Sequence, residues 1–128
     1  METRPIPPTP ERIAAIDVGS NSIRMSVADY DPTKGLVIVD EVKDQPRLAA
    51  GIAATGALDT EAMSRAIAVL KRMKEVADRR GVTRLRAVAT SAVREAVNGR
   101  MFAKRVRKET GITIEVVDGE TEANLSFR

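Results

Sequence analysis

Residues 13–27 form two strand-length apolar segments joined by a short polar turn, and this pattern constrains the fold of the chain most strongly. The turn covers residues 17–22 and contains an acid, a glycine and three small hydroxyl or amide residues. Gly19 tolerates backbone angles that a side chain forbids, and it lets another atom approach the main chain closely. The pattern fits either an ordinary hairpin turn or a concave cluster of N–H groups suited to an anionic oxygen. Both alternatives are open from this stretch alone.

The rest of the chain predicts an antiparallel meander followed by α/β crossovers. Strands are expected over residues 12–18, 23–30, 36–43, 84–89 and 112–117, and helices over 59–80, 90–96, 98–110 and 120–127. The order β-β-β-α-β-α-α-β-α is typical of an α/β fold with a mixed five-stranded sheet and helices packed on it. Asp59 and Asn98 are expected to cap the two longer helices.

Composition limits the chemistry that is open to the chain. There is no cysteine and no histidine, which excludes disulfides, thiolate zinc sites and a Ser-His-Asp arrangement. Aromatic residues are scarce, which argues against single-stranded nucleic-acid binding. The formal net charge of +3 weakly favours anionic partners, and the basic face of the long helix is interpreted as solvated surface. No apolar run suits a membrane span and no signal peptide is recognised, so a cytoplasmic protein is expected.

Three polar clusters follow three of the predicted strands, over residues 17–22, 90–94 and 118–122. The strand over residues 84–89 is expected to run parallel to the first and last strands, so all three clusters would lie at one edge of the sheet. Ligands of α/β sheets gather beyond the carboxyl ends of strands, and helix N-termini there attract phosphate. Together the clusters predict an anion-binding site.

Four motifs carry a resemblance to a known family. They are DVGSNSIR (17–24), KDQPRLAAGI (43–52), ATSAVREAVN (89–98) and VDGETEA (117–123). In this order they resemble the exopolyphosphatase and guanosine pentaphosphate phosphatase family, of the actin-like, Hsp70-like and sugar-kinase superfamily. The resemblance implies a ribonuclease H-like (actin-like ATPase) lobe that hydrolyses terminal phosphoanhydride bonds of inorganic polyphosphate or guanosine pentaphosphate.

The resemblance also implies roles for individual residues. Glu122 matches the carboxylate that acts as general base on the attacking water; the alternative is a helix-start acid favoured by the dipole, which is the expected role of Glu120. Asp17 is expected to approach Mg²⁺ through water, or only to initiate a turn. The residues implied in substrate binding are Gly19, Ser20, Asn21, Ser22, Thr90, Ser91 and Arg94.

Some of these roles have local alternatives. A guanidinium such as that of Arg94 can hold two phosphate oxygens at once, although most arginines are surface residues. Thr90 and Ser91 offer hydroxyl contacts or simply cap a helix. Lys43 and Arg47 are expected either to touch the polyanion or to be solvated.

The chain is shorter than the family pattern. Residues 1–11 hold four prolines and are expected to be a disordered tail, and residues 12–128 resemble the first lobe alone, with the second lobe absent. Such a lobe is expected to be a weak or inactive phosphatase. It is also expected to self-associate, with a homodimer as one form. The alternatives are a non-catalytic module that binds polyphosphate or an alarmone, and a kinase or ATPase of the wider superfamily, against which the motif over residues 89–98 argues.

Overall fold

The computed structural model of the protein describes residues 11–117, and the structural statements below concern these residues. The elements follow in the order β1 (Glu11–Val18), β2 (Ile23–Asp31), β3 (Gly35–Asp44), α1 (Ile52–Thr55), α2 (Thr60–Arg79), β4 (Arg84–Ala89), α3 (Ser91–Glu95), α4 (Gly99–Thr110) and β5 (Ile114–Val116). The short helix α1 was not expected from the sequence. The helix predicted over residues 120–127 lies outside the described residues, as does most of the Pro-rich tail.

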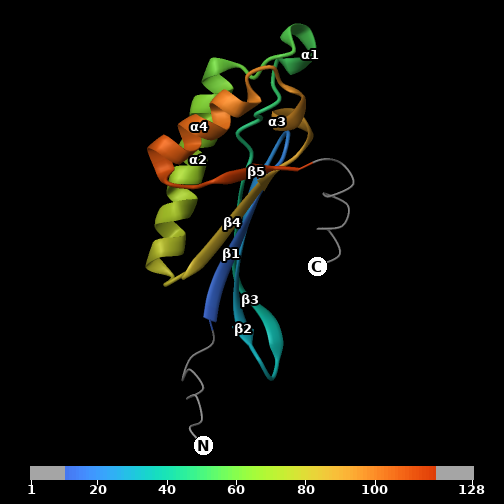
Figure 1. Ribbon diagram of the computed structural model, residues 1–128. Helices are drawn as coiled ribbons and strands as arrows, with labels where there is room; N and C mark the ends of the chain where they lie inside the picture. The colour runs from blue at the N-terminus through green and yellow to red at the C-terminus, as the bar shows by residue number, and fades with distance from the viewer. Residues whose placement is uncertain (1–10, 118–128) are drawn as a thin grey trace, which may run out of the picture.

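The five strands form one mixed sheet in the order β3-β2-β1-β4-β5. Strand β2 pairs antiparallel with β1 and β3, whereas β4 pairs parallel with both β1 and β5. This confirms the predicted meander and the predicted direction of β4. The register places Val18 beside Ala89, and Ala89 beside Val116, so the carboxyl ends of β1, β4 and β5 meet at one edge of the sheet (Figure 1).

Helix α2 is the main cover of the sheet. The Asp59 carboxylate accepts hydrogen bonds from the N–H groups of Glu61 and Ala62, which confirms it as the N-cap. The apolar residues recur every three or four positions and are buried as one stripe: Ala62, Met63, Ala66, Ile67, Val69, Leu70, Met73 and Ala77.

The sheet is covered on one side only within residues 11–117. Helices α2 and α4 pack against each other and lie on the same side of the sheet (Figure 1). Alternate strand residues are buried beneath them, among them Ile16 of β1 and Met25 of β2. The residues between them point to the opposite side, which we call the open face; it includes Ile13, Ala15 and Asp17 of β1.

The expectation that Asn98 caps α4 with its side chain is wrong. Asn98 stands at the N-cap position but makes no side-chain cap bond. Its Oδ1 accepts the N–H of Leu58 at 2.8 Å, and its Nδ2 donates to the carbonyl of Leu58 at 3.0 Å. An amide supplies both a donor and an acceptor, so Asn98 satisfies both backbone groups of a buried residue that lies 40 positions away.

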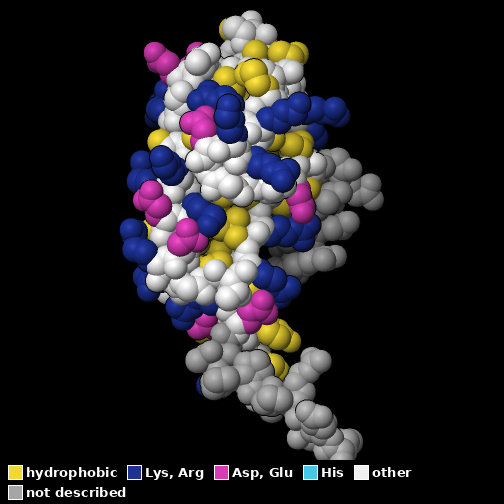
Figure 2. Space-filling view, turned by 60° about the vertical axis from the view of Figure 1, so that its left-hand side comes forward, with side chains coloured by type: hydrophobic (Ala, Val, Ile, Leu, Met, Phe, Trp, Pro, Cys, Tyr) yellow, Lys and Arg dark blue, Asp and Glu magenta, His cyan; other side chains and the backbone are white. Residues whose placement is uncertain are grey.

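Charges of both signs are mixed on the helical side, which Figure 2 brings forward. Several basic residues of α2 and its end are paired with acids: Arg72 with Asp44 at 2.7 Å, Lys74 with Asp78 at 2.7 Å and Arg80 with Asp40 at 2.8 Å. Exposed pairs of this kind contribute little to stability. None of the described helices has the length and apolar character needed to cross a bilayer.

Candidate functional site

The turn between β1 and β2 is held closed by its own backbone. The N–H of Gly19 donates to the carbonyl of Ser22 at 3.0 Å. A Cβ on Gly19 would lie 3.0 Å from that same oxygen, which is too close for a relaxed contact. The φ of Gly19 is not positive, so glycine is favoured at this position by the close approach of the Ser22 carbonyl and not by a left-handed backbone.

The turn presents hydrogen-bond donors. The carbonyls of Ser20 and Asn21 accept the N–H groups of Ala49 and Arg47, at 2.8 and 3.0 Å. The N–H groups of Ser20, Asn21 and Ser22 have no acceptor among the described residues. Successive N–H groups without acceptors are suited to an anion, so the structure favours the anion cradle over a plain hairpin turn.

The segment that braces this turn belongs to the second motif. Arg47 has a φ of 54°, a left-handed conformation that is uncommon for a residue with a side chain. Its N–H bond to Asn21 stabilises this conformation, and its side chain is exposed. From the sequence, the Arg47 side chain was expected either to contact the polyanion or to be solvated; support of the turn by the backbone of Arg47 was not predicted.

The second polar cluster meets the first directly. The Oγ atoms of Ser20 and Ser91 lie 3.2 Å apart, within hydrogen-bond distance, and the N–H of Thr90 donates to the carbonyl of Val18 at 3.3 Å. Thr90 is buried and stands at the N-cap of α3, yet it makes no side-chain cap bond. Capping therefore does not account for its hydroxyl.

Arg94 joins the end of β5 to the same edge. Its Nη1 donates to the carbonyl of Val117 at 2.8 Å, and its Nη2 lies 3.9 Å from Oε1 of Glu95. The N–H of Val117 in turn donates to the carbonyl of Ala89. These bonds tie α3 to the carboxyl ends of β4 and β5 and hold a cation close to the polar turn.

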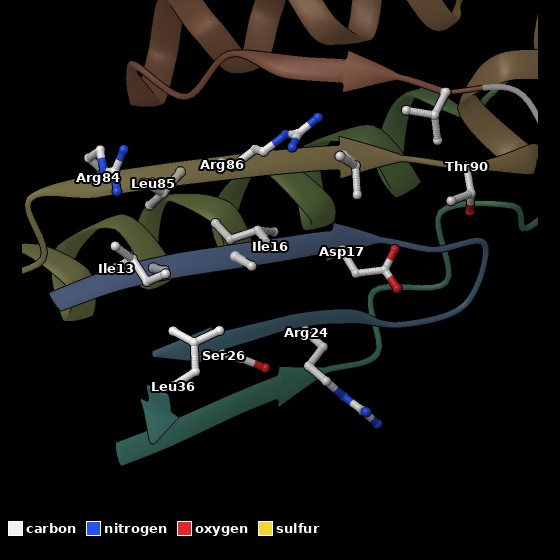
Figure 3. Close-up of a pocket in the computed structure, with 14 residues that line it drawn as sticks. Ile13, Ile16, Asp17, Arg24, Ser26, Leu36, Arg84, Leu85, Arg86 and Thr90 are labelled. Atoms are coloured by element: carbon white, nitrogen blue, oxygen red, sulfur yellow. The ribbon is translucent and has the colours of Figure 1, made fainter. Parts of the chain in front are cut away.

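Asp17 and Arg24 are cross-strand neighbours at the same end of the sheet. Both are exposed, and both line a hollow of about 740 Å³ along the open face (Figure 3). The hollow reaches the polar edge at Asp17 and Thr90, but most of its lining is aliphatic. Phosphate needs donors and positive charge, so the polar edge is the candidate site and the hollow adjoins it. Arg24 ends the first motif but was not predicted to be a site residue, although its pairing opposite Asp17 follows from the short turn.

Not every predicted site residue is described. The structure brings together Asp17, Thr90, Ser91, Arg94 and the turn from Gly19 to Ser22. Glu120 and Glu122 lie outside the described residues, so their roles stay predictions. Within residues 11–117, no three Asp, Glu, His or Cys side chains gather as metal ligands; Asp17 is the carboxylate at the polar edge.

Comparison with known proteins identifies a family and several relatives that this chain resembles. Residues 26–128 match the Ppx/GppA phosphatase family. "Exopolyphosphatase 1" of Mycobacterium tuberculosis is 33% identical over 116 residues, covering 91% of this chain and 34% of that protein. The chain thus spans about a third of the length of the curated relatives it matches.

Solved structures agree. An Aquifex aeolicus Ppx/GppA family member superposes with a TM-score of 0.84 at 38% identity, covering 88% of this chain and 36% of that one. An exopolyphosphatase from Cytophaga hutchinsonii superposes with a TM-score of 0.85 at 33% identity, covering 90% of this chain and 36% of that one. These similarities confirm the expected α/β lobe of actin-like type. Together with the family match over most of the chain, they show that the chain belongs to the Ppx/GppA phosphatase family.

Proposed function

We propose that this chain is the phosphate-binding lobe of a hydrolase that removes terminal phosphoryl groups from inorganic polyphosphate or guanosine pentaphosphate. One observation carries the proposal: a turn with three N–H groups that lack described acceptors is bonded through Ser20 to Ser91, one helical turn from Arg94. Donors and a guanidinium so arranged suit a phosphoryl group. The names of the similar exopolyphosphatases support polyphosphate as the substrate class.

The chemistry we propose is in-line attack of water on the terminal phosphoryl group. The turn N–H groups and the hydroxyls of Thr90 and Ser91 bind its oxygens, and the charge of Arg94 stabilises the transition state. The exposed Arg47, whose backbone supports the turn, is the nearest candidate for contact with the next phosphate along the chain. Lys43, which pairs with Arg24 near the end of β3, is a second candidate.

Mg²⁺ fits the donors at this edge. The ion is usually held by one or two carboxylates together with substrate phosphates and waters, and Asp17 supplies one exposed carboxylate beside the turn. We propose that Asp17 holds Mg²⁺ through water. When bound, the ion would neutralise charge on the phosphate oxygens.

Glu122 is the proposed general base. It follows Val117 by five residues, so it lies within about 18 Å of a backbone position that Arg94 anchors to the site. The chain has no histidine, so a carboxylate must orient or deprotonate the attacking water. Glu120 is the matched comparison, because it is the same residue type two positions earlier.

The chain spans about a third of the length of its curated relatives, and we propose that it supplies one wall of a larger site. Water would be poorly excluded from a half-enclosed phosphate, which weakens electrostatic stabilisation of the transition state. We therefore propose that further polypeptide of the same family closes the site, and that this chain alone is weak or inactive and self-associates. A half-enclosed site that binds phosphate but stabilises the transition state weakly also suits the second candidate, a non-catalytic module that binds polyphosphate or an alarmone.

Paired variants separate the two candidates. Glu122→Gln should lower phosphate release from polyphosphate by about 10²-fold or more and preserve binding measured by calorimetry, whereas Glu120→Gln should change neither. If Glu122→Gln leaves a measurable rate unchanged, the binding module is the better description. Competition between polyphosphate and guanosine pentaphosphate ranks the two ligands.

A second pair of variants tests phosphate binding alone, without a need for turnover. Arg94→Ala should weaken polyphosphate binding by about tenfold or more, while Arg100→Ala, an exposed arginine on α4, should have little effect. Equal losses in the two variants would mean that binding reflects net charge and not this site.

A further inference from the structure

Strand β3 forms one edge of the sheet, and its outer side pairs with no described strand. It is ten residues long, whereas β5 at the opposite edge has only three. The far end of the β2–β3 hairpin also projects beyond the layer of helices (Figure 1). A long edge strand presents a row of backbone donors and acceptors, and these can pair with a strand of another molecule.

The projecting part of β3 carries a run of exposed apolar side chains. Residues 36–39, which we call the apolar run, are Leu36, Val37, Ile38 and Val39, with exposed fractions of 57, 46, 57 and 38%. Adjacent strand residues point to opposite sides of a sheet, so apolar surface is exposed on both sides of the hairpin. Consecutive exposed apolar residues of this kind mark a surface that another molecule covers.

We propose that the β3 strands of two copies of this chain pair antiparallel along this edge and form a weak homodimer. A second copy offers the same unpaired edge and the same apolar run, and residues 35–39 hold no charge that self-pairing would oppose. Pairing supplies partners to the backbone groups of both strands. It also removes the apolar run of each copy from water.

Charge selects the antiparallel direction. Lys34 precedes the apolar run and Glu41 follows it, and both are exposed without an ion pair to a described residue. Asp31 and Asp40 are already bound, to N–H groups of the turn and to Arg80. Antiparallel pairing sets the basic end of one run beside the acidic end of the other. Parallel pairing would set like charges side by side, which is destabilising.

A bulge in β3 sets the register of the pair. Val39 is skipped in the pairing of β3 with β2, so the regular part of the strand ends at Ile38. A two-fold axis at Val37 uses this regular part fully, because Val37 then lies opposite its own copy and Leu36 lies opposite Ile38. An axis one residue earlier would set the charge of Lys34 against Ile38. The structure therefore favours the axis at Val37.

The absence of native cysteine makes this register testable in the full chain. Val37→Cys places two thiols across the axis, whereas Val97→Cys is an exposed control outside the sheet. A short bis-maleimide is added, and each rate is normalised to the reaction of the same thiol with N-ethylmaleimide. Val37→Cys should form the crosslinked dimer about tenfold faster or more, since pairing raises the effective concentration of the thiols. Equal normalised rates would overturn the proposal.

Sedimentation equilibrium measures the dimer without a crosslinker. Ile38→Lys puts a charge into the apolar run, a device that protects natural edge strands, and it acts twice in a symmetric dimer. It should raise the dissociation constant of the dimer about tenfold or more. Met101→Lys changes an exposed apolar residue of α4 in the same way and should have little effect. Far-UV circular dichroism checks that both variants are folded.

Two sedimentation results would contradict the proposal. One is a parent chain that stays monomeric at every concentration, and the other is an equal loss of dimer in the two lysine variants. The inference rests on the self-association proposed above but not on phosphate binding, so the two fail separately. A monomeric parent that binds polyphosphate overturns only the dimer, and a dimer that binds no polyphosphate overturns only the phosphate site.

Discussion

Replacing Asn98 with aspartate should make stability depend on pH in an unusual direction. The Asn98 amide bonds both backbone groups of Leu58, at 2.8 and 3.0 Å, and Leu58 is 3% exposed. Leu58 directly precedes the cap of α2, so these bonds join the start of α4 to the start of the main helix. Loss of the amide therefore affects the packing of two helices.

The expected loss in the free energy of unfolding follows from the two hydrogen bonds of the Asn98 amide. A neutral hydrogen bond contributes about 0.5–1.5 kcal/mol, so Asn98→Ala should cost about 1–3 kcal/mol. Asn98→Asp retains the acceptor for the N–H of Leu58 but sets a carboxylate oxygen against the Leu58 carbonyl. At neutral pH the cost should therefore also be about 1–3 kcal/mol.

Acid should partly restore the aspartate variant. The protonated acid donates to the Leu58 carbonyl as the amide does, so folding should raise its pKa above the unfolded value of about 3.9. A raised folded pKa contributes stability that is present below the unfolded pKa and is lost as pH rises through the folded pKa. The difference in the free energy of unfolding between Asn98→Asp and the parent should thus shrink toward low pH.

Urea unfolding followed by far-UV circular dichroism measures this difference, at about pH 7 and about pH 4. Asn21→Asp is the matched control, because the exposed Asn21 side chain makes no hydrogen bond with described residues. The same deficit for Asn98→Asp at both pH values would refute the proposed role of the donor. Full stability of Asn98→Ala would refute the role of the whole amide.

Two further predictions concern packing and acid stability. Gly99→Ala should destabilise by about 1–3 kcal/mol in urea unfolding, because its Cβ would clash with the Val93 carbonyl; a stability gain, as helix propensity alone suggests, would contradict this. Arg12 donates to Asp29 at 2.7 Å and lowers the pKa of that carboxyl, so this stabilisation is present above the unfolded pKa and is lost as pH falls through the folded pKa. Asp29→Asn should therefore lose less stability than the parent on acidification, and parallel acid curves for the two proteins would contradict the pairing.

Much of the fold was predictable because it depends on patterns between residues that are near one another in the sequence. Ile23, Met25 and Val27 alternate in sequence, and all three are buried on one side of β2. Asp59 caps α2 as expected, because a cap needs only neighbouring N–H groups. The polar clusters over residues 17–22 and 90–94 meet at one edge, which could be inferred once β4 was taken as parallel. The cluster over residues 118–122 lies outside the described residues.

The missed features depend on distant partners. Asn98 was expected to bond its own helix, but the competing groups belong to Leu58. The support that Arg47 and Ala49 give to the polar turn was also missed, because backbone bonds between separated segments leave no mark on composition or periodicity. Helix α1 is only four residues long, too short for a periodic pattern.

The order of the described strands and helices apart from α1, the motifs and the residue types at the candidate site can all be inferred from the amino-acid sequence, since these follow from local periodicity and side-chain chemistry. Three features became visible only in the folded domain. The carbonyls of Ser20 and Asn21 accept hydrogen bonds from Ala49 and Arg47, Ser20 meets Ser91, and one face of the sheet is open within residues 11–117. Each of these is a contact, or the lack of one, between segments far apart in the chain. Such pairings are selected by the packing of the whole domain and are not encoded in any single stretch.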